Sequence, residues 1–266
     1  MKALIDADIL VYRVGFASED VTEESIVKWR LNDMISRMLD TVEADDFTCY
    51  LTSTDRSNFR FTLYPEYKGH RTKPKPKYYD FLRQVLVEDY AAEVVSGVEA
   101  DDSLGIAQIA NWWGDGKPKG TNQSDFNIIK GPQTVICTID KDLDMIPGWH
   151  YNFVKERKYY ISDLEAYRSF YWQVLVGDKA SDNIDGCPDI GKVKATKYLE
   201  GSTCEKEMYD LVVRKYKEAF VYKGVNALWL AGQLLWIRRV PDQGWTRPTG
   251  EVVSKNTLEN SFKSLE

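Results

Sequence analysis

The chain has 266 residues, of which 43% are hydrophobic and 29% are charged, and its formal net charge is -6. This length suffices for one large core, or for a core with a small satellite domain. The acidic balance argues against a simple nucleic-acid coat protein, because such proteins are usually basic. With only two histidines, His70 and His150, the composition also argues against a zinc site or a histidine-based catalytic triad.

The amino-terminal stretch MKALIDADILVYR lacks the apolar core of a signal peptide. The sequence has no apolar run of about 18 residues, the length that a membrane-spanning helix needs. The four cysteines are widely spaced and form no CxxC pair, which indicates reduced thiols in a cytosolic setting. We therefore expect a soluble, cytoplasmic protein without a membrane partner.

Strands and helices alternate in the first half of the sequence. Apolar and β-branched runs predict strands, and apolar spacing of three and four residues predicts helices. The predicted strands are 3–5, 47–52 and 92–96, and the predicted helices are 22–42, 78–90 and 104–113. Thr22 is the predicted cap of the first helix. Ser96 and Glu99 have the spacing of a capping box, which would place the acids that follow in the first turn of a helix.

The same alternation continues after a predicted loop at 114–132, which is rich in Gly, Pro, Asn and Ser. The further predicted strands are 134–139, 151–154 and 158–161, and the further predicted helical segments are 163–176, 192–199 and 206–239. The last 25 or so residues are polar, and no element is assigned to them. This order predicts an α/β fold with a parallel sheet that is covered by helices on both faces.

Carboxylates follow three of the predicted strands. Asp6 and Asp140 come directly after apolar strands, and the acids at 99–102 follow the strand at 92–96. In open α/β sheets, ligands collect at the carboxyl ends of the strands, so three distant segments can bring acids to one edge. Carboxylates that lie close together repel one another, and a Mg²⁺ or Mn²⁺ ion among them relieves that repulsion.

Eight acids are candidates for such a site: Asp6, Glu99, Asp101, Asp102, Asp140, Asp142, Asp178 and Asp182. One Mg²⁺ ion uses only one or two carboxylates, so the set fits two ions about 3.5–4 Å apart better. Such a pair can activate a water and stabilise the leaving oxygen of a phosphodiester. The basic, aromatic-rich segment 59–77 would then hold phosphates.

Six short motifs occur in order along the chain: Ile5–Asp8, Tyr64–Arg71, Gly97–Asp102, Thr138–Leu143, Gly177–Asn183 and Gly186–Gly191. Each motif alone is moderately specific for a protein family, and the occurrence of all six in this order is very specific. On these residues the sequence resembles the FEN-like 5′ nucleases, a group that contains phage 5′→3′ exonucleases and the 5′-nuclease domains of bacterial DNA polymerases. The resemblance extends from Leu4 to about Leu199. The length of the chain, without a polymerase domain, is most similar to that of a free-standing phage enzyme.

The resemblance implies a PIN-like α/β core with two divalent metal ions at the edge of the sheet. It assigns Asp6, Glu99, Asp101 and Asp102 to the tighter metal, and Asp140, Asp142, Asp178 and Asp182 to the group shared with or nearest the second metal. Lys68 and Arg71 match the catalytic basic residues that touch the scissile phosphate. Tyr67 matches an aromatic residue on which a terminal base stacks, a contact worth about 1–3 kcal/mol. Residues 59–90 match a helical arch or clamp.

Residues 186–195 resemble the helix-hairpin-helix (H3TH) element of this family. Its glycines permit a tight turn, and its backbone amides can face a DNA phosphate. The DNA-binding residues expected here are Gly186, Ile190, Gly191, Lys192 and Lys194. In relatives this hairpin binds duplex DNA and often a K⁺ ion.

The sequence departs from the family pattern in three places. Gly177–Asn183 carries one residue more than the usual G-D-x-x-D-N spacing, which leaves open whether Asp178 or Asp182 reaches a metal. Ser53 occupies the position where many relatives have an Asp, with Asp55 two residues further on. Asp8 lies where relatives more often have a small or polar residue, and we assign it no role.

The resemblance implies a nuclease core at 1–165, an H3TH region at 166–240 and a carboxyl-terminal tail at 241–266. The predicted function is a metal-dependent 5′→3′ exonuclease or flap endonuclease of phage DNA replication, monomeric, acting on DNA with a free 5′ end, nick, gap or flap and on RNA–DNA hybrids. Two alternatives are a PIN-type ribonuclease and a non-catalytic protein that binds branched DNA. The hairpin motif argues against the first, and the nearly complete set of acids argues against the second.

Overall fold

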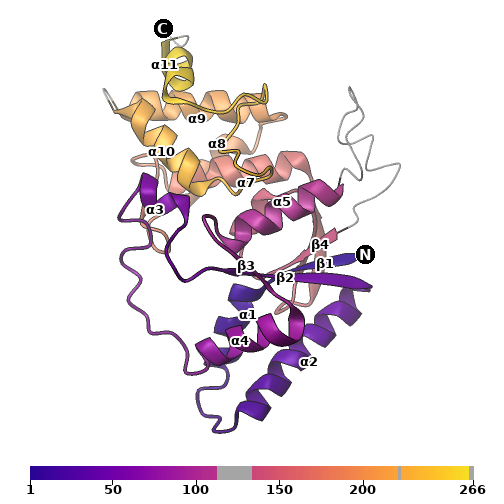
Figure 1. Cartoon of the computed structure of the whole chain (residues 1–266). Coiled ribbons are helices and arrows are strands. Elements are labelled where there is room, and N and C mark those ends of the chain that lie inside the picture. Colours follow the sequence, from indigo (N-terminus) through magenta and orange to yellow (C-terminus); the bar gives the residue numbers. More distant parts are fainter. Residues whose placement is uncertain (113–133, 221–222, 264–266) are drawn as a thin grey trace. The chain divides into compact units, whose positions relative to one another are not determined.

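The computed structural model describes residues 1–112, 134–220 and 223–263 (Figure 1). These residues form two compact units. Unit 1 comprises Met1–Asn58 and Thr72–Ile161, and unit 2 comprises Phe59–Arg71 and Ser162–Glu266. The predicted loop at 114–132 lies outside the described residues. Within the described part of the chain, no helix is both long and apolar enough to cross a membrane.

Unit 1 contains a six-stranded sheet with the order β3-β2-β1-β4-β5-β6. All neighbours pair in parallel except β5 and β6, which are antiparallel. The strands are β1 (Lys2–Asp6), β2 (Asp46–Thr52), β3 (Glu93–Val95), β4 (Thr134–Cys137), β5 (Gly148–Asn152) and β6 (Arg157–Ile161). The α/β class with a mostly parallel sheet is therefore confirmed.

Helices cover both faces of this sheet, as predicted (Figure 1). One face packs on α1 (Ala7–Phe16), α2 (Glu24–Val42) and α4 (Tyr79–Tyr90), and the other packs on α5 (Ala100–Trp112). Side chains alternate between the faces along each strand. Ile5 and Cys137 belong to the core cluster that includes α1, α2 and α4. Leu4 and Ile136, which are also fully buried, take the alternate positions.

Two predicted helix caps are wrong. The cap residue of α2 is Glu23 instead of Thr22, and its side chain makes no capping hydrogen bond. At the start of α5, the Glu99 amide donates a 3.1 Å bond to Oδ2 of Asp102, whereas the Ser96 hydroxyl donates to Asp55 at 3.3 Å. A capping box requires a Ser or Thr hydroxyl to accept from the helix, and Ser96 is directed to a neighbouring loop instead.

The helix α4 is part of the core of unit 1. Leu82 and Leu86 are fully buried, and α4 packs against α1, α2 and β2. Sequence analysis assigned residues 79–90 to the arch. This part of the predicted arch has the burial of an ordinary core helix, because its apolar stripe of Tyr79, Leu82, Val85 and Leu86 faces inward.

Unit 2 consists mainly of helices. They are α3 (Phe59–Leu63), α7 (Asp163–Val176), α8 (Lys192–Leu199), α9 (Glu205–Ala219), α10 (Gly224–Leu235) and α11 (Lys255–Lys263). A two-stranded antiparallel ribbon, β7 (Gly177–Asp178) and β8 (Ile184–Asp185), follows α7. The predicted continuous helical segment at 206–239 is divided into α9 and α10, and the predicted tail contains α11.

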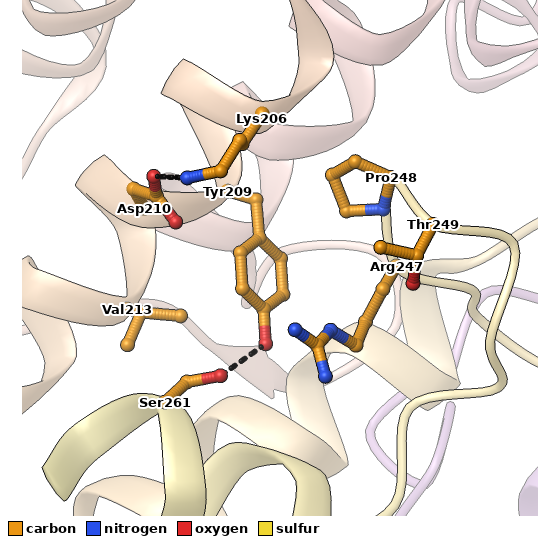
Figure 2. Close-up of a pocket in the computed structure, with 8 residues that line it drawn as sticks. All are labelled: Lys206, Tyr209, Asp210, Val213, Arg247, Pro248, Thr249 and Ser261. Atoms are coloured by element: carbon orange, nitrogen blue, oxygen red, sulfur yellow. Dashed lines mark hydrogen bonds and ion pairs between the residues drawn. The ribbon is translucent and has the colours of Figure 1, made fainter. Parts of the chain in front are cut away.

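A pocket of 190 Å³ lies in unit 2 (Figure 2). Tyr209 projects into it, and its hydroxyl shares a 3.0 Å hydrogen bond with Ser261. The two cations at its wall are each paired with an acid, Lys206 with Asp210 at 2.5 Å and Arg247 with Glu251 at 3.2 Å. None of the residues that line this pocket belongs to the predicted site.

Candidate metal and phosphate site

Asp6 stands at the carboxyl end of β1 and caps the helix that follows. Its Oδ1 accepts a 3.2 Å hydrogen bond from the Ile9 amide, and its Oδ2 accepts a 2.8 Å hydrogen bond from the hydroxyl of Thr138. Thr138 follows β4, which pairs with β1 in parallel. Two strand ends that are distant in sequence therefore meet at one carboxylate that is only 2% exposed.

The electrostatics of Asp6 indicate a crowded set of carboxylates. Burial raises the pKa of Asp6, the nearby charges of Asp8 and Asp140 raise it further, and the hydrogen bonds from Thr138 and Ile9 lower it, so that the pKa is about 7. A divalent cation bound among these carboxylates would offset their mutual repulsion and favour the ionised form of Asp6. The oxygen donors around Asp6 fit a hard divalent cation in this respect.

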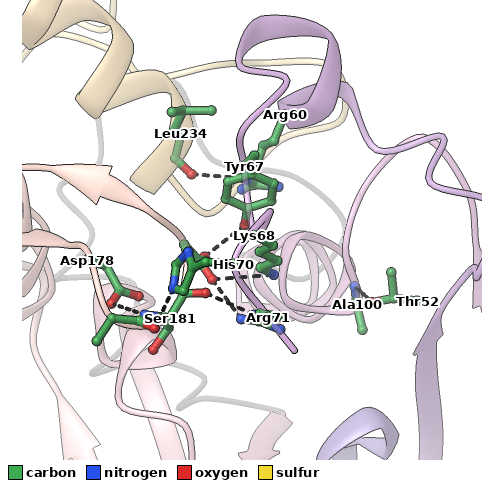
Figure 3. A network of polar contacts seen from close by, with 12 residues as sticks. Thr52, Arg60, Tyr67, Lys68, His70, Arg71, Ala100, Asp178, Ser181 and Leu234 are labelled. Atoms are coloured by element: carbon green, nitrogen blue, oxygen red, sulfur yellow. Dashed lines mark hydrogen bonds and ion pairs between the residues drawn. The ribbon is translucent and has the colours of Figure 1, made fainter. Parts of the chain in front are cut away.

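Thr52, the last residue of β2, makes hydrogen bonds to residues of three other elements. Its amide donates a 2.9 Å hydrogen bond to Asp8, and its carbonyl accepts a 2.8 Å hydrogen bond from Arg83. Its hydroxyl oxygen accepts from the Ala100 amide at 2.9 Å, a contact labelled in Figure 3. Thr52 thus connects the end of β2 with α1, α4 and the first turn of α5.

Asp8 and Arg83 form an ion pair of 3.2 Å, and neither residue was assigned a role from the sequence. Burial raises the pKa of Asp8, the bonds from Thr52 and the charge of Arg83 lower it, and Glu99 raises it. Glu99 is therefore near Asp8. The helical spacing of α4 could have shown that Arg83 shares a helix with core residues, but not that it reaches Asp8.

Asp101 and Asp102 occupy the first turn of α5, as predicted, whereas Glu99 directly precedes the helix. Asp102 is fully buried and bonds the Glu99 amide, while Glu99 and Asp101 are half-buried. A helix amino terminus stabilises negative charge through its free amides. The placement of these acids next to Ala100 and Thr52 brings them to the same sheet edge as Asp8.

Asp140 and Asp142 lie directly after β4. The Asp140 amide donates to the Thr138 hydroxyl at 3.0 Å, and the Asp142 amide donates to Oδ1 of Asp140 at 2.9 Å. Asp142 begins a short 3-10 helix, η1 (Asp142–Met145). Thr138 is the residue that links this turn to Asp6, and its position inside the motif 138–143 was the available signal for it.

Six of the eight predicted acids lie in unit 1, and Asp178 and Asp182 lie in unit 2. Within the described residues, no three Asp, Glu, His or Cys side chains are grouped closely enough to hold an ion as they stand.

In unit 2, the predicted basic residues lie beside the loop that joins β7 and β8 (Figure 3). The Tyr67 hydroxyl donates to Oδ2 of Asp182 at 2.9 Å, and an Arg71 amino group donates to Oδ1 of Asp182 at 2.7 Å. The Lys68 ammonium is 3.9 Å from the same carboxylate. Sequence analysis placed these three residues and Asp182 in one site but did not predict direct contacts among them.

The predicted hairpin follows α7 and leads into α8. Gly177 has a φ of +75°, and a Cβ atom on it would come within 2.4 Å of the Gly186 nitrogen. A Cβ atom on Gly186 would come within 2.3 Å of the Val176 carbonyl carbon, so both positions require glycine. Gly191 is the cap residue of α8, and Gly191, Lys192 and Lys194 are exposed. The Lys194 ammonium donates to the Asp189 carbonyl at 2.9 Å. This arrangement leaves an exposed helix amino terminus with cations beside it.

Comparisons with known proteins give a fold and a weak sequence relationship. No family model matches this chain. The chain is 28% identical over 229 residues to DNA polymerase I of Caldicellulosiruptor bescii, and 28% identical over 211 residues to DNA polymerase I of Bacillus subtilis. These matches cover 79% and 74% of this chain but only 25% and 23% of the polymerases. The chain thus spans about a quarter of the length of the curated relatives that it matches.

Solved structures of a bacteriophage T5 nuclease have the same fold. The T5 flap endonuclease in a complex with DNA and metal ions matches with a TM-score of 0.55 and 15% identity, covering 99% of this chain and 97% of the other. The T5 5′-exonuclease with bound zinc ions matches with a TM-score of 0.55 and 14% identity, covering 100% of this chain and 98% of the other. In fold, and more weakly in sequence, this chain is similar to the FEN-like 5′ nucleases, as its motifs predicted.

Proposed function

We propose that this protein is a metal-dependent 5′ nuclease that hydrolyses phosphodiester bonds of DNA at or near a 5′ end. The observation that carries the proposal is the convergence at Asp6. This buried carboxylate lies at the end of β1, within the field of Asp8 and Asp140, and is bonded to Thr138 at the end of β4. The similarity in fold to a flap endonuclease crystallised with DNA and metal ions supports the same reading.

We propose two Mg²⁺ or Mn²⁺ ions as cofactors. The proposed ligands are Asp6, Glu99, Asp101, Asp102, Asp140 and Asp142, together with one of Asp178 and Asp182, whose spacing leaves open which of the two reaches a metal. When bound, such ions supply an activated water and stabilise charge on the leaving oxygen. The chain's own contribution in unit 1 is to hold the carboxylates at the strand ends through Thr138, Thr52 and the first turn of α5.

The metal assignment has a test that does not require activity. The Asp6→Asn variant removes one buried charge beside Asp8 and Asp140, so in EDTA its melting temperature should equal or exceed that of the wild type. Adding Mg²⁺ should raise the melting temperature of the wild type and have a smaller effect on the variant, because only a bound ion stabilises the folded state. An equal response to Mg²⁺ in both proteins would contradict the role of Asp6.

The DNA contacts proposed are those of the basic segment and the hairpin. Lys68 and Arg71 would act on the scissile phosphate. The ring of Tyr67, which was expected to stack on a terminal base, is only 1% exposed and packs on Phe61, so Tyr67 would support the two cations instead of stacking. Gly186, Ile190, Gly191, Lys192 and Lys194 would hold the duplex, with a K⁺ ion at the hairpin as in relatives. The exposed amino terminus of α8 supports this, because backbone amides there can bind a phosphate.

The decisive experiment uses a 5′-labelled flap duplex and a blunt duplex, each with Mg²⁺ and with excess EDTA. We expect Mg²⁺-dependent release of mononucleotides or short 5′ fragments, and the first labelled product separates exonuclease from flap cleavage. Asp101→Asn and Asp140→Asn should abolish cleavage and leave the fold intact. Asp46→Asn is the control, since this exposed acid lies at the amino end of β2 and pairs with Lys2. Full activity in both acid variants would refute the proposed roles of Asp101 and Asp140 as metal ligands.

Two outcomes would favour the alternatives. Tight binding of flap DNA in Ca²⁺, without cleavage in Mg²⁺ or Mn²⁺, would indicate a branched-DNA-binding protein. Faster cleavage of single-stranded RNA than of any DNA substrate would indicate a PIN-type ribonuclease.

Lys68→Ala should lower the cleavage rate more than it weakens duplex binding. Equal losses in cleavage rate and in duplex affinity would make Lys68 a binding residue only.

We also propose that the protein is a monomeric, cytoplasmic enzyme of phage DNA replication, and that it acts on RNA primers in duplexes as well as on DNA. Cleavage of a 5′ RNA segment annealed to DNA would support the last point. Light scattering of the purified protein with and without flap DNA would test whether it is a monomer.

A further inference from the structure

In unit 2, two short segments distant in sequence are joined by a dense set of polar contacts. One is Tyr67–Arg71, and the other is the loop Asp178–Asn183 between β7 and β8 (Figure 3). The Lys68 amide donates to the Asp182 carbonyl at 3.1 Å, the Arg71 Nε group donates to the Ser181 carbonyl at 2.9 Å, and the His70 ring lies 2.8 Å from the Ala180 carbonyl. The Asn183 amide group donates in the opposite direction, to the Glu66 carbonyl at 3.1 Å.

The centre of these contacts is the carboxylate of Asp182. Each of its oxygens has its own donor, Tyr67 on Oδ2 and Arg71 on Oδ1, and Lys68 approaches to 3.9 Å. The side chains of Asp182 and Lys68 are 15% and 19% exposed, whereas that of Arg71 is 54% exposed. A hydrogen bond to a charged group contributes more than one between neutral groups, and the bond from buried Tyr67 is the better shielded of the two.

The backbone around this centre adopts conformations that need such support. Lys68 has a φ of +54°, and Asn183, directly after the carboxylate, has a φ of +62°. A lysine is uncommon in the left-handed region, and it persists there where surrounding contacts determine the conformation. Near the amino-terminal end of the basic segment 59–77, buried Arg60 donates to the carbonyls of Leu234 and Trp236, each at 2.8 Å. The basic segment is thus fixed at two points.

The turn that carries Asp182 is closed by its own hydrogen bonds. The Asp182 amide donates to the Asp178 carbonyl at 3.1 Å, and the Ser181 amide donates to the Asp178 carboxylate at 3.1 Å. The last acid of this turn lies against Tyr67 and Arg71.

We propose that Asp182 is a positioning residue that holds Lys68 and Arg71 in a preformed arrangement for a phosphate of the DNA backbone. The assignment of phosphate as the ligand rests on the proposed function; the anchoring itself does not. One carboxylate beside two cations leaves a net positive charge, so the anchored pair keeps its attraction for a phosphodiester. In this arrangement Asp182 acts through Lys68 and Arg71 and not as a ligand of the second metal.

The first test measures the anchor in EDTA and without DNA. Trypsin cuts after Lys68 and Arg71 are followed by mass spectrometry; Lys73 and Lys75 precede prolines and do not contribute cuts. We expect Asp182→Ala to raise the rate of these two cuts about tenfold or more, because cleavage tracks local opening. Asp182→Asn should have a smaller effect, since its amide oxygen still accepts from Tyr67. The control is Asp185→Asn in β8, the strand that follows this loop; Asp185 is an exposed acid that pairs with Lys179.

Wild-type cutting rates in both Asp182 variants would overturn the proposal. If Asp182→Ala does not fold, Asp182→Asn and Tyr67→Phe decide. The first change removes the charge that pairs with Arg71, and the second removes the hydrogen bond from Tyr67. Each variant should be cut faster than the wild type, and wild-type cutting rates in both would overturn the anchor.

The second test separates a positioning residue from a metal ligand. We expect the cleavage defect of Asp182→Asn to persist when the Mg²⁺ concentration is raised, and to be smaller than the defect of Asp182→Ala. A defect that is abolished by additional Mg²⁺ would identify Asp182 as a metal ligand and refute the positioning role. If the wild type does not cleave DNA at all, the nuclease proposal fails, whereas the trypsin result still decides whether Asp182 anchors the segment.

Discussion

The hydroxyl of Thr138 donates a 2.8 Å hydrogen bond to Asp6 and accepts a 3.0 Å hydrogen bond from the amide of Asp140. Thr138 is 2% exposed, so both bonds are shielded from water. One side chain therefore connects the carboxylate after β1 with the turn after β4. The predicted metal ligands Asp6 and Asp140 are therefore connected to each other through one shared side chain.

Replacing Thr138 should separate the hydroxyl from the size of the side chain. Thr138→Val leaves Asp6 without this donor and the Asp140 amide without its acceptor, so we expect a loss of about 1–3 kcal/mol in the free energy of unfolding. Thr138→Ser keeps the hydroxyl and should lose less. Urea unfolding in EDTA measures both. Equal losses in the two variants would assign the effect to packing of the methyl group.

The pair of Asp8 and Arg83 should stabilise unit 1. The side chain of Arg83 is 13% exposed, and it also donates to the Thr52 carbonyl at 2.8 Å. Arg83→Ala would leave Asp8 without a cation and the carbonyl without a donor, at a cost of about 1–3 kcal/mol. Arg37→Ala is the matched control, because Arg37 pairs with Asp33 on an exposed helix face and should cost about 0–1 kcal/mol. Similar losses for both arginines would contradict a structural role for the Asp8 pair.

His150 should make the protein less stable in mild acid. Burial lowers the pKa of His150 to about 4, and its Nε2 lies 2.7 Å from the Ile146 carbonyl. Its buried Nδ1 has no hydrogen-bond partner among the residues that the structure describes. The unfolded chain takes up a proton near pH 6.5 and the folded chain only near pH 4. Stability should therefore fall as the pH decreases between these values, by on the order of 3 kcal/mol.

The variant His150→Gln isolates this contribution. Glutamine does not titrate and can still donate to the Ile146 carbonyl. Its free energy of unfolding should depend less on pH between 6.5 and 4 than that of the wild type. Parallel pH profiles of the two proteins would show that His150 is not the group responsible.

Glu205 in unit 2 should make the protein less stable as the pH rises, the opposite of the effect of His150. Burial raises its pKa to about 7, although the Tyr171 hydroxyl donates to it at 3.2 Å and Arg239 lies near. The folded chain holds this proton up to a higher pH than the unfolded chain, so stability is lost as the pH rises from about 4.5 to 7. Glu205→Gln should stabilise the protein at pH 8 by about 1–3 kcal/mol and change little at pH 4.

Glu207 provides the control on the same helix. Its carboxylate accepts from the Thr203 amide at 2.7 Å, and this bond lowers its pKa. Glu207→Gln should therefore give no gain at pH 8. If both glutamine variants stabilise the protein equally, the gain comes from the net charge of the chain and not from the burial of Glu205.

Much of the local structure follows from the sequence alone. Apolar runs predicted β1, β2 and β4 and the helices α2, α4 and α7 within a few residues, because the burial of one face imposes its period on the side chains. The positions of Asp6 and Asp140 at strand ends follow from the same pattern. That these ends meet at one edge follows from the parallel α/β order, which the alternation of elements predicted.

Tertiary structure decided what each polar group bonds. Ser96 has the spacing of a helix cap, yet it donates to Asp55, and Asp8 acquires Arg83 from a helix that sequence analysis placed in the arch. Thr52 and Thr138 organise the strand ends, and Asp182 holds Tyr67 and Arg71 across more than a hundred residues. The period of apolar residues determines which side of an element is buried. The partner of a polar side chain is determined only when distant segments close on one another, and their separation along the chain carries no information about that contact.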